Sequence, residues 1–281
     1  MNTVKTIHQD ETTRYLKLVT PAEREAAWFY EENFVPALFA PWSARTIAAA
    51  GIEPGDRVLD IACGTGVVTR EIAAITGSDS PPVGLDLSPG MLTVAHSLDK
   101  RIDWRLGDAG QLPFADGSFD RVVCQFGLMF FTDRVKALAE MRRVLRPAGR
   151  LAIAVWAGLE HNPGYAEKVQ VLEHIAGPAA AEALRAPFCL GDQERLLEFA
   201  RAAGIGDLRI ETHAGEACFG NLFEFVDVDL RGWLPVMGVH LDELTISQVQ
   251  AACGPALGRY VDSQSGRITL PARALILRGS S

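Results

Sequence analysis

The stretch "VLDIACGTGVVT" (residues 58–69) joins an apolar run to a helical pattern through a turn with two glycines. Gly64 and Gly66 lack side chains, so the backbone can turn tightly there and approach a ligand closely. The helix that follows offers free N–H groups in its first turn, which suit an anionic group. The stretch alone predicts a strand, a turn and a helix, because such a turn can also bind nothing.

Short apolar runs alternate with helical patterns from residue 57 onwards. The apolar runs are "RVLDIA", "PVGLDL", "IDWRLG", "FDRVVCQFG" and "LAIAVW". The intervening patterns indicate a helix that stops at Gly77, a second that begins at the N-cap Ser88, and a third from about Asp133. This alternation is typical of βαβ units on a parallel sheet.

After Trp156 the pattern loosens, with helices expected near 164–176 and 192–203. Strands are predicted near "DLRIETHA" and in "RITLPARALILRG", where Pro271 argues against the early part or marks a sheet edge. We therefore expect an α/β fold with a Rossmann-like, doubly wound sheet of seven mostly parallel strands. Residues 1–50 are expected to form a helical cover. Residues 51–281 should form the Rossmann-like domain, with a mostly helical insertion at about 220–265.

Composition narrows the function classes. The chain has 281 residues, of which 48% are hydrophobic, and a formal net charge of −8. The negative charge argues against nucleic acid as the main partner. The longest apolar runs fall short of the roughly 18 residues of a spanning helix, and the polar opening residues indicate a cytoplasmic protein. The five scattered cysteines indicate reduced, mostly buried thiols, and we expect no metal site.

Acidic residues follow the apolar runs at regular places. Asp86 ends the second predicted strand, where an acid can accept hydrogen bonds from ribose hydroxyls of nicotinamide and adenosyl cofactors alike. The frame "GTGVVT" places Thr69 where the dinucleotide fingerprint has its third glycine, which disfavours a pyrophosphate ligand. Asp108 follows the third strand and can accept from an adenine amino group. Three acids after three successive strands, Asp60, Asp86 and Asp108, indicate an adenosine-bearing ligand.

At these residues the chain resembles the class I S-adenosylmethionine-dependent methyltransferases, in particular the branch similar to the ubiquinone and menaquinone biosynthesis methyltransferases. The matching text is "PGDRVLDIACGTGVVTREIA", "GLDLSPGML", "GDAGQLPFADGSFDRVVCQFGLMFF" and "EMRRVLRPAGRLAIAVW". It covers about residues 54–156. The resemblance implies the cofactor S-adenosyl-L-methionine.

The resemblance also implies positions for the cofactor. The methionine part would be bordered by residues of the glycine turn, namely Asp60, Ala62, Gly64 and Gly66. Around the nucleoside, Asp86 would hold the ribose, Met91 would pack on the adenine face, and Asp108 with Ala109 would meet the adenine. Gln125 and Phe126 would lie near the activated methyl group. The family's first motif often has a further glycine where this chain has Ala62.

Aromatic faces can favour the sulfonium by cation–π attraction, and the candidates are Tyr30, Phe34, Trp42 and Phe126. The adjacent Glu31 and Glu32 are interpreted as a solvated face.

His161 is the candidate catalytic base because the loop after the fifth strand should open over the acceptor. Tyr165 and His240 rank below it.

The leading hypothesis is a methyltransferase that acts on a small organic acceptor by in-line transfer. Aromatic residues of the insertion favour an apolar or aromatic acceptor. The sequence leaves open whether oxygen, carbon or nitrogen receives the methyl group, and whether the protein is a homodimer. Two alternatives stay open: a non-catalytic S-adenosylmethionine-binding regulatory protein, and an NAD-dependent oxidoreductase.

Overall fold

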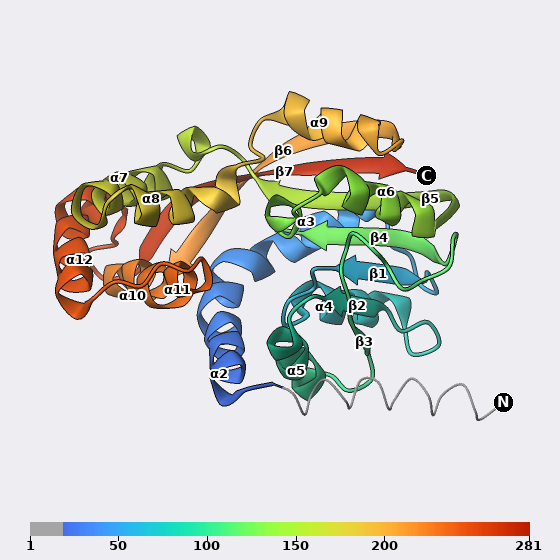
Figure 1. Ribbon diagram of the computed structural model, residues 1–281, viewed down its shortest axis with the longest axis horizontal. Coiled ribbons are helices and arrows are strands. Elements are labelled where there is room, and N and C mark those ends of the chain that lie inside the picture. Colours follow the sequence, from blue (N-terminus) through green and yellow to red (C-terminus); the bar gives the residue numbers. More distant parts are fainter. Residues whose placement is uncertain (1–18) are drawn as a thin grey trace.

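Seven strands form one sheet in the order β3-β2-β1-β4-β5-β7-β6, as seen in a computed structural model that describes residues 19–281 (Figure 1). The strands are β1 (Val58–Ile61), β2 (Val83–Asp86), β3 (Asp103–Leu106), β4 (Phe119–Gln125), β5 (Leu145–Trp156), β6 (Gly206–Phe219) and β7 (Ile268–Ser280). All pairs are parallel except those of β7, which runs antiparallel to both neighbours. The predicted mostly parallel, seven-stranded sheet is confirmed.

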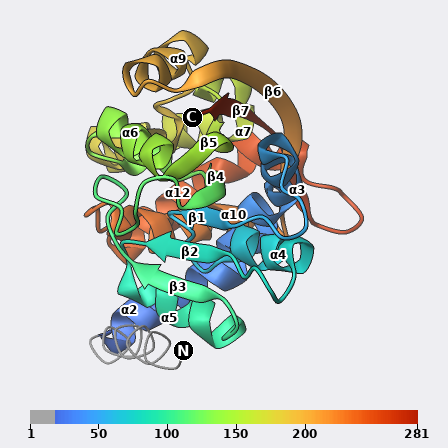
Figure 2. The same cartoon turned by 90° about the vertical axis from the view of Figure 1, so that its right-hand side faces the viewer.

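The central strands are buried on both faces, which is why they read as continuous apolar runs. All four residues of β1 are buried, and so are the first six of β4. Helices α3 (Ala40–Ala50), α4 (Val67–Thr76) and α5 (Pro89–Leu98) cover one face. Helices α6 (Arg134–Val144) and α9 (Gln193–Ala202) cover the other, and Figure 2 shows the two layers.

The predicted helix boundaries in this sheet follow from capping chemistry. Helix α4 ends at Gly77, and α5 begins at Ser88, whose hydroxyl accepts a hydrogen bond from the N–H of Met91. Helix α6 has Asp133 as its N-cap residue. Because these caps satisfy backbone groups that the helix leaves free, they fix helix ends locally and are readable from sequence.

Helices also precede the sheet. Helix α2 (Pro21–Phe29) starts with a capping box between Thr20 and Glu23 and continues into a π-helical segment, η1 (Tyr30–Phe39), and then α3. Pro36 lies inside η1, where it removes one backbone donor. Residues 21–50 are thus helical, as expected, whereas residues 1–18 of the predicted range lie outside the described part, and the division of the chain at residue 50 stays a prediction.

Strands β6 and β7 extend beyond the end of β5. Pairing between β5 and β7 begins at Ala274, so residues 268–273 of β7 pair with β6 and not with β5. Pro271 lies in this section of β7. Because β5 does not pair here, the missing N–H of Pro271 removes no hydrogen bond to β5, and the strand continues through the proline. The early part of the last predicted strand is therefore real.

A helical cap lies between and beside these extended strands (Figure 1, left). Its first part follows β5 and comprises η3 (Leu159–His161), α7 (Pro163–Ala176), α8 (Pro178–Arg185) and η4 (Ala186–Phe188). Its second part is inserted between β6 and β7 and comprises α10 (Leu222–Asp227), η5 (Val228–Trp233), α11 (Leu234–Val236), α12 (Glu243–Leu257) and η6 (Gly258–Tyr260). Helix α8 was not predicted, because its buried face is mostly alanine.

Three composition-based expectations can be compared with the structure. Cys63, Cys124 and Cys253 are buried, and all five cysteines are free thiols. Within residues 19–281, no helix combines the length and hydropathy that crossing a bilayer requires. The same residues contain no group of three or more His, Cys, Asp or Glu side chains suited to a metal ion.

Candidate functional site

The two glycines of the turn after β1 have different roles. Both have left-handed backbone angles, with φ of 56° at Gly64 and 87° at Gly66. A methyl group on Gly66 would lie 2.2 Å from the ring of Trp104, so Gly66 makes room for that ring. A methyl group on Gly64 would meet only the ring of Tyr30, at 3.5 Å. A side chain on Gly64 would therefore meet Tyr30 in ordinary van der Waals contact, whereas one on Gly66 would clash with Trp104.

Ala62 also has a left-handed backbone, with φ of 54°, which is uncommon for a residue with a side chain. Its methyl group fits because it lies against Gly127, where an added Cβ would be 2.5 Å away. A glycine in the turn after β4 thus accommodates the alanine in the turn after β1. The alanine at position 62, where the family motif often has glycine, is therefore accommodated by Gly127 in the neighbouring loop.

Asp60 lies below the turn rather than on its surface. Its carboxylate is 1% exposed and accepts a hydrogen bond of 2.6 Å from the hydroxyl of Thr69 on α4. Burial raises the pKa of Asp60 to about 7, although the hydrogen bond from Thr69 lowers it. Thr69, which stands at the third glycine position of the dinucleotide fingerprint, therefore has a specific partner here.

Asp86 connects the ends of two strands. Its carboxylate accepts hydrogen bonds of 2.8 Å from the N–H of Gly64 and from the N–H of Ser88. Burial raises the pKa of Asp86, and the N–H donors oppose that rise. The same residue thus fixes the glycine turn and the first turn of α5, where Met91 lies partly buried. This places Asp86, Gly64 and Met91 around one corner of the sheet.

Asp108 lies in the loop after β3 and is exposed, with one carboxylate oxygen accepting from the N–H of Gly110 at 2.8 Å. The neighbouring Ala109 is buried. Because β3, β2 and β1 are adjacent, the loop with Asp108 follows the strand beside that of Asp86. The structure brings the three predicted acids to one edge of the sheet, with Asp60 turned inward.

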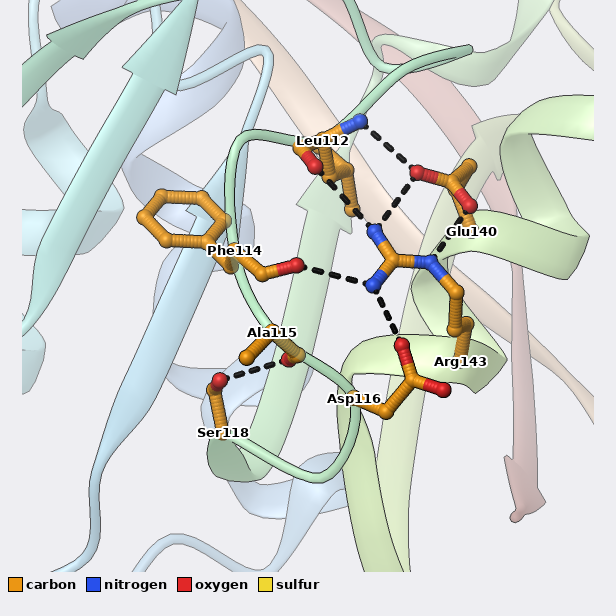
Figure 3. Close-up of polar contacts among 7 residues, drawn as sticks. All are labelled: Leu112, Phe114, Ala115, Asp116, Ser118, Glu140 and Arg143. Carbon is orange, nitrogen blue, oxygen red and sulfur yellow. Dashed lines mark hydrogen bonds and ion pairs between the residues drawn. The ribbon is translucent and has the colours of Figure 1, made fainter.

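The loop after β3 is held by Arg143 of α6 (Figure 3). Its guanidinium binds both oxygens of Glu140, at 2.6 and 2.8 Å, and donates to the carbonyl groups of Leu112 and Phe114. It also pairs with Asp116 at 2.8 Å, and Glu140 accepts from the N–H of Leu112. This planar fork of donors fixes the loop that carries Asp108 and Ala109.

The N-terminal helices are attached to the glycine turn by Glu31. Its carboxylate accepts a 2.5 Å hydrogen bond from Thr65 and forms a 2.9 Å ion pair with Arg70. The interpretation of Glu31 as part of a solvated face was therefore wrong, because the π-helical segment turns it toward the sheet. Glu32 is exposed, as expected.

Gln125, at the end of β4, also connects the cover to the sheet. Its side-chain carbonyl accepts from the hydroxyl of Thr46 at 2.7 Å, and its amide donates to the carbonyl of Phe39 at 3.0 Å. Both ends of the side chain are thus engaged by the helices before the sheet. The next residue, Phe126, has φ of 55° and stacks on Trp156 with ring centroids 4.0 Å apart.

An aromatic cavity of about 120 Å³ opens beside these residues. Tyr30 lines it while also facing Gly64, so this ring lies between the glycine turn and the cavity. Phe34 and Phe126, two of the predicted aromatic residues, also line the cavity. The other lining residues are Leu38, Phe39, Met129, Phe130, Trp156, Asn162, Tyr165, Leu184, Pro187, Phe188, Asp229, Trp233 and Ala272.

Trp42 and His161 lie away from this surface. Trp42 is fully buried behind the wall, in edge-to-face contact with Phe126 and Trp156, so it supports the aromatic residues that line the cavity. The side chain of His161 is 47% exposed and lies 3.7 Å from Glu160, outside the cavity lining. The neighbouring Asn162, not His161, turns inward, because the short η3 helix directs His161 to the surface.

Sequence reasoning missed several cavity residues. Phe39, Trp156, Phe188 and Asp229 line the cavity but were not candidates, and Tyr165 was ranked low. Trp156 had one usable signal, since it ends the fifth predicted strand at the same edge as the acids. The others come from segments whose meeting depends on the tertiary fold.

Residues 59–153 match the family described as methyltransferase domain. The demethylmenaquinone methyltransferase of Mycobacterium sp. (strain KMS) is 50% identical over 112 residues, which are 40% of this chain and 46% of that protein. The ubiquinone/menaquinone biosynthesis C-methyltransferase of Teredinibacter turnerae is 42% identical over 118 residues, or 40% and 47% of the two chains. The chain spans about half the length of the curated relatives it matches.

Solved structures share the fold over more of the chain. A methyltransferase-like protein from Bacillus halodurans superposes with a TM-score of 0.57 at 19% identity, covering 84% of this chain and 97% of that one. Phosphoethanolamine N-methyltransferase 2 from Haemonchus contortus gives 0.57 at 18% identity, over 92% and 57% of the two chains. Residues 59–153 thus match a methyltransferase domain and are similar in sequence to the ubiquinone and menaquinone biosynthesis methyltransferases, and the solved structures share the fold.

Proposed function

We propose that this protein is an S-adenosylmethionine-dependent methyltransferase that acts on a small organic acceptor by in-line transfer. The observation that carries the proposal is the position of Tyr30, whose ring faces the glycine turn on one side and lines the aromatic cavity on the other. A cofactor on the turn and an acceptor in the cavity would then meet at one place.

The residues at the strand ends suit the cofactor. Asp86 offers carboxylate lone pairs for ribose hydroxyls, and Gly64 carries no side chain that would keep a ligand away from the backbone of the turn. Asp108 and Ala109 would meet the adenine, with Met91 on its face. The remaining proposed cofactor residues are Asp60, Ala62, Gly66, Gln125, Phe126, Tyr30 and Trp42, of which Asp60, Gly66 and Trp42 act from behind the surface. The matched relatives and the Haemonchus contortus structure with bound S-adenosylhomocysteine support this assignment.

When bound, S-adenosylmethionine would supply a methyl group that its sulfonium already activates. The protein then has to align the acceptor and exclude water. Tyr30, Phe39 and Phe126 contribute aromatic faces, and the first two stack with centroids 5.3 Å apart. These faces can favour a positive charge by cation–π attraction.

Burial and the charge of Asp86 raise the pKa of Tyr30, so its hydroxyl acts as a donor at neutral pH rather than as a base.

We assign the acceptor to the aromatic cavity, which the N-terminal cover, the cap after β5 and the insertion all line. This supports an apolar or aromatic molecule as the partner. We propose the division into a cover (residues 1–50) and a methyltransferase domain (residues 51–281) on the same basis. The cytoplasmic location, the absence of nucleic-acid binding and the oligomeric state stay predictions.

Calorimetric titration with S-adenosylmethionine and S-adenosylhomocysteine, with NAD as the control ligand, tests the proposal. We expect micromolar binding of both adenosyl compounds and no binding of NAD. Absence of adenosyl binding would contradict the proposal, and binding of NAD alone would favour the oxidoreductase. Adenosyl binding without any product on a broad acceptor panel would favour the non-catalytic alternative.

A further inference from the structure

One end of the aromatic cavity carries a buried polar cluster. Helix α7 places Tyr165 and Lys168 one turn apart, and η5 of the insertion places Asp229 opposite them. The ammonium group of Lys168 lies 2.5 Å from Oδ2 of Asp229 and also donates to the carbonyl of Phe225. The Lys168 side chain is completely buried, and that of Asp229 is 4% exposed.

The charges of this cluster cancel. Lys168 and Asp229 form an ion pair, and the ammonium group also lies 4.0 Å from the centre of the Phe225 ring. A charged ligand group placed beside the pair would leave an uncompensated charge in an apolar cavity, which is costly. The cluster therefore suits an uncharged polar group.

Two atoms of the cluster are left without a hydrogen bond. The hydroxyl of Tyr165 is buried and has no hydrogen-bond partner among residues 19–281, and Tyr165, which is 8% exposed, lines the cavity. No hydrogen bond from the described residues reaches Oδ1 of Asp229, whose carboxylate also lines the cavity. A buried hydroxyl without a hydrogen-bond partner destabilises the folded protein, so a ligand that supplies the missing bond is bound more tightly.

The other polar side chains near this end already have partners. The amide of Asn162 donates to the carbonyls of Ala157 and Gly158 and accepts from the N–H of Arg273 at 2.9 Å. The indole N–H of Trp233 donates to the carbonyl of Ala183 at 2.8 Å. Tyr165 and Asp229 are thus the groups with unused hydrogen-bonding capacity at this end.

We propose that Tyr165 and Asp229 bind a hydroxyl group of an uncharged, otherwise apolar acceptor, with Lys168 as the positioning residue for Asp229. The Tyr165 hydroxyl donates to the acceptor oxygen, and Oδ1 of Asp229 accepts from the acceptor O–H. A hydroxyl satisfies both because it is donor and acceptor at once. The inference rests on the proposed methyltransferase function only in treating the bound molecule as a methyl acceptor. The binding of a hydroxyl group at Tyr165 and Asp229 does not depend on that function.

The hydroxyl would be held away from the glycine turn. A series of ring contacts connects Tyr30 to Tyr165, through Phe39 at 5.3 Å, Trp156 at 6.5 Å, Phe188 at 6.4 Å and finally Tyr165 at 5.4 Å. Burial, with a smaller contribution from Asp229, raises the pKa of the Tyr165 hydroxyl, which keeps it a donor at neutral pH. The cluster acts in this assignment as a specificity determinant.

The test uses a matched pair of one-ring probes, 4-methylphenol and 1,4-dimethylbenzene, which differ by a hydroxyl in place of a methyl group. A cavity of this volume suits one ring, since an engineered cavity of roughly 150 Å³ binds benzene. Affinities are measured by NMR titration of the wild type, Tyr165→Phe and the double variant Lys168→Met/Asp229→Leu. Tyr260→Phe, a tyrosine outside the cavity, is the control.

We expect the wild type and Tyr260→Phe to prefer 4-methylphenol by about five- to ten-fold. Tyr165→Phe should reduce that preference to less than about two-fold and leave the affinity for 1,4-dimethylbenzene unchanged. The double variant Lys168→Met/Asp229→Leu should likewise lose the preference and bind 1,4-dimethylbenzene as the wild type does. A preference that survives in Tyr165→Phe, or a wild type that binds neither probe, would overturn the proposal. Thermal unfolding of each variant confirms that it is folded.

S-adenosylhomocysteine is titrated into the same samples to separate the two proposals. Loss of the hydroxyl preference with intact adenosyl binding concerns the acceptor site alone. If the protein prefers 4-methylphenol but binds no adenosyl compound, the proposed hydroxyl-binding site is supported and the proposed methyltransferase function is refuted.

Discussion

The proposed cofactor end of the site and the proposed acceptor cavity are built in opposite ways. Asp60, Gly64 and Asp86 lie within 27 residues of one another, and backbone groups make many of their contacts. The cavity draws on segments spread from Tyr30 to Ala272, and its contacts are between side chains, mostly aromatic. A local backbone device can be read from a short motif, whereas a cavity assembled from distant side chains depends on the whole fold.

The two regions also differ in how they bury charge. At the cofactor end, Asp60 is buried with a neutral partner, the hydroxyl of Thr69, while in the cavity Asp229 is buried with a cation. Substitutions should therefore have different consequences at the two ends. The predictions below test this difference, from the largest expected effect to the smallest.

Lys168→Met should lower the free energy of unfolding by about 3–5 kcal/mol, because it leaves the buried Asp229 without its cation. Denaturant unfolding followed by circular dichroism measures this. The double variant Lys168→Met/Asp229→Leu, which removes both charges, should recover most of the loss. Equal stability of the single variant and the wild type would mean that the ion pair is not a fixed part of the cavity wall.

Asp60 should make stability depend on pH in a defined window. Its folded pKa of about 7 lies above the ordinary value of 3.8. Its contribution is therefore complete below about pH 4, decreases as the unfolded chain ionises first, and is gone above about pH 7. The difference in unfolding free energy between the wild type and Asp60→Asn should fall by up to about 4 kcal/mol across that range.

Denaturant unfolding at intervals from pH 4 to pH 9 without cofactor measures this difference. Thr69→Val should move the window upward, because it removes the hydroxyl that lowers the pKa of Asp60. A difference that does not vary with pH would show that Asp60 is ionised in the folded protein.

Asp86→Ala should weaken binding of S-adenosylhomocysteine by roughly 1–3 kcal/mol, because it removes ribose hydrogen bonds and loosens Gly64 and Ser88. Asp108→Ala should have a smaller effect, about 1 kcal/mol, because Asp108 is exposed and, among residues 19–281, its carboxylate accepts a hydrogen bond from Gly110 alone. Calorimetry measures both. Binding of 4-methylphenol in the cavity should not change, and unaltered cofactor binding in both variants would refute the site map.

His161→Ala should leave cofactor affinity and probe binding unchanged, because the side chain is half exposed and lies outside the cavity lining. Once an acceptor is identified, turnover of the variant should match that of the wild type. Slower turnover with the same cofactor affinity would instead support the base role that the sequence indicates.

The cofactor end was largely predictable from sequence. The glycine turn, the caps at Ser88 and Asp133 and the acids at the carboxyl ends of β1, β2 and β3 all follow from local rules. Even there, sequence did not show that Asp60 faces inward to Thr69 or that Gly66 makes room for Trp104. Those facts depend on how α4 and β3 pack, which is not a local property.

The acceptor end could not be predicted in the same way. An isolated aromatic residue such as Phe188 or an isolated acid such as Asp229 has no local signal, because the same residue types occur throughout cores and surfaces. His161 illustrates the opposite error: its position after β5 was predicted correctly, but a single helical turn decides that Asn162 points inward instead.

The sequence by itself determined the βαβ order, the sheet and the glycine turn after β1, because periodicity, caps and glycine turns act over a few residues. Only the tertiary structure decided that Tyr30 joins the turn to a cavity and that Tyr165, Lys168 and Asp229 gather at its other end. The physical reason is range: backbone conformation is set by neighbours along the chain, whereas a cavity wall is set by side chains that meet only after the sheet and its cap have packed.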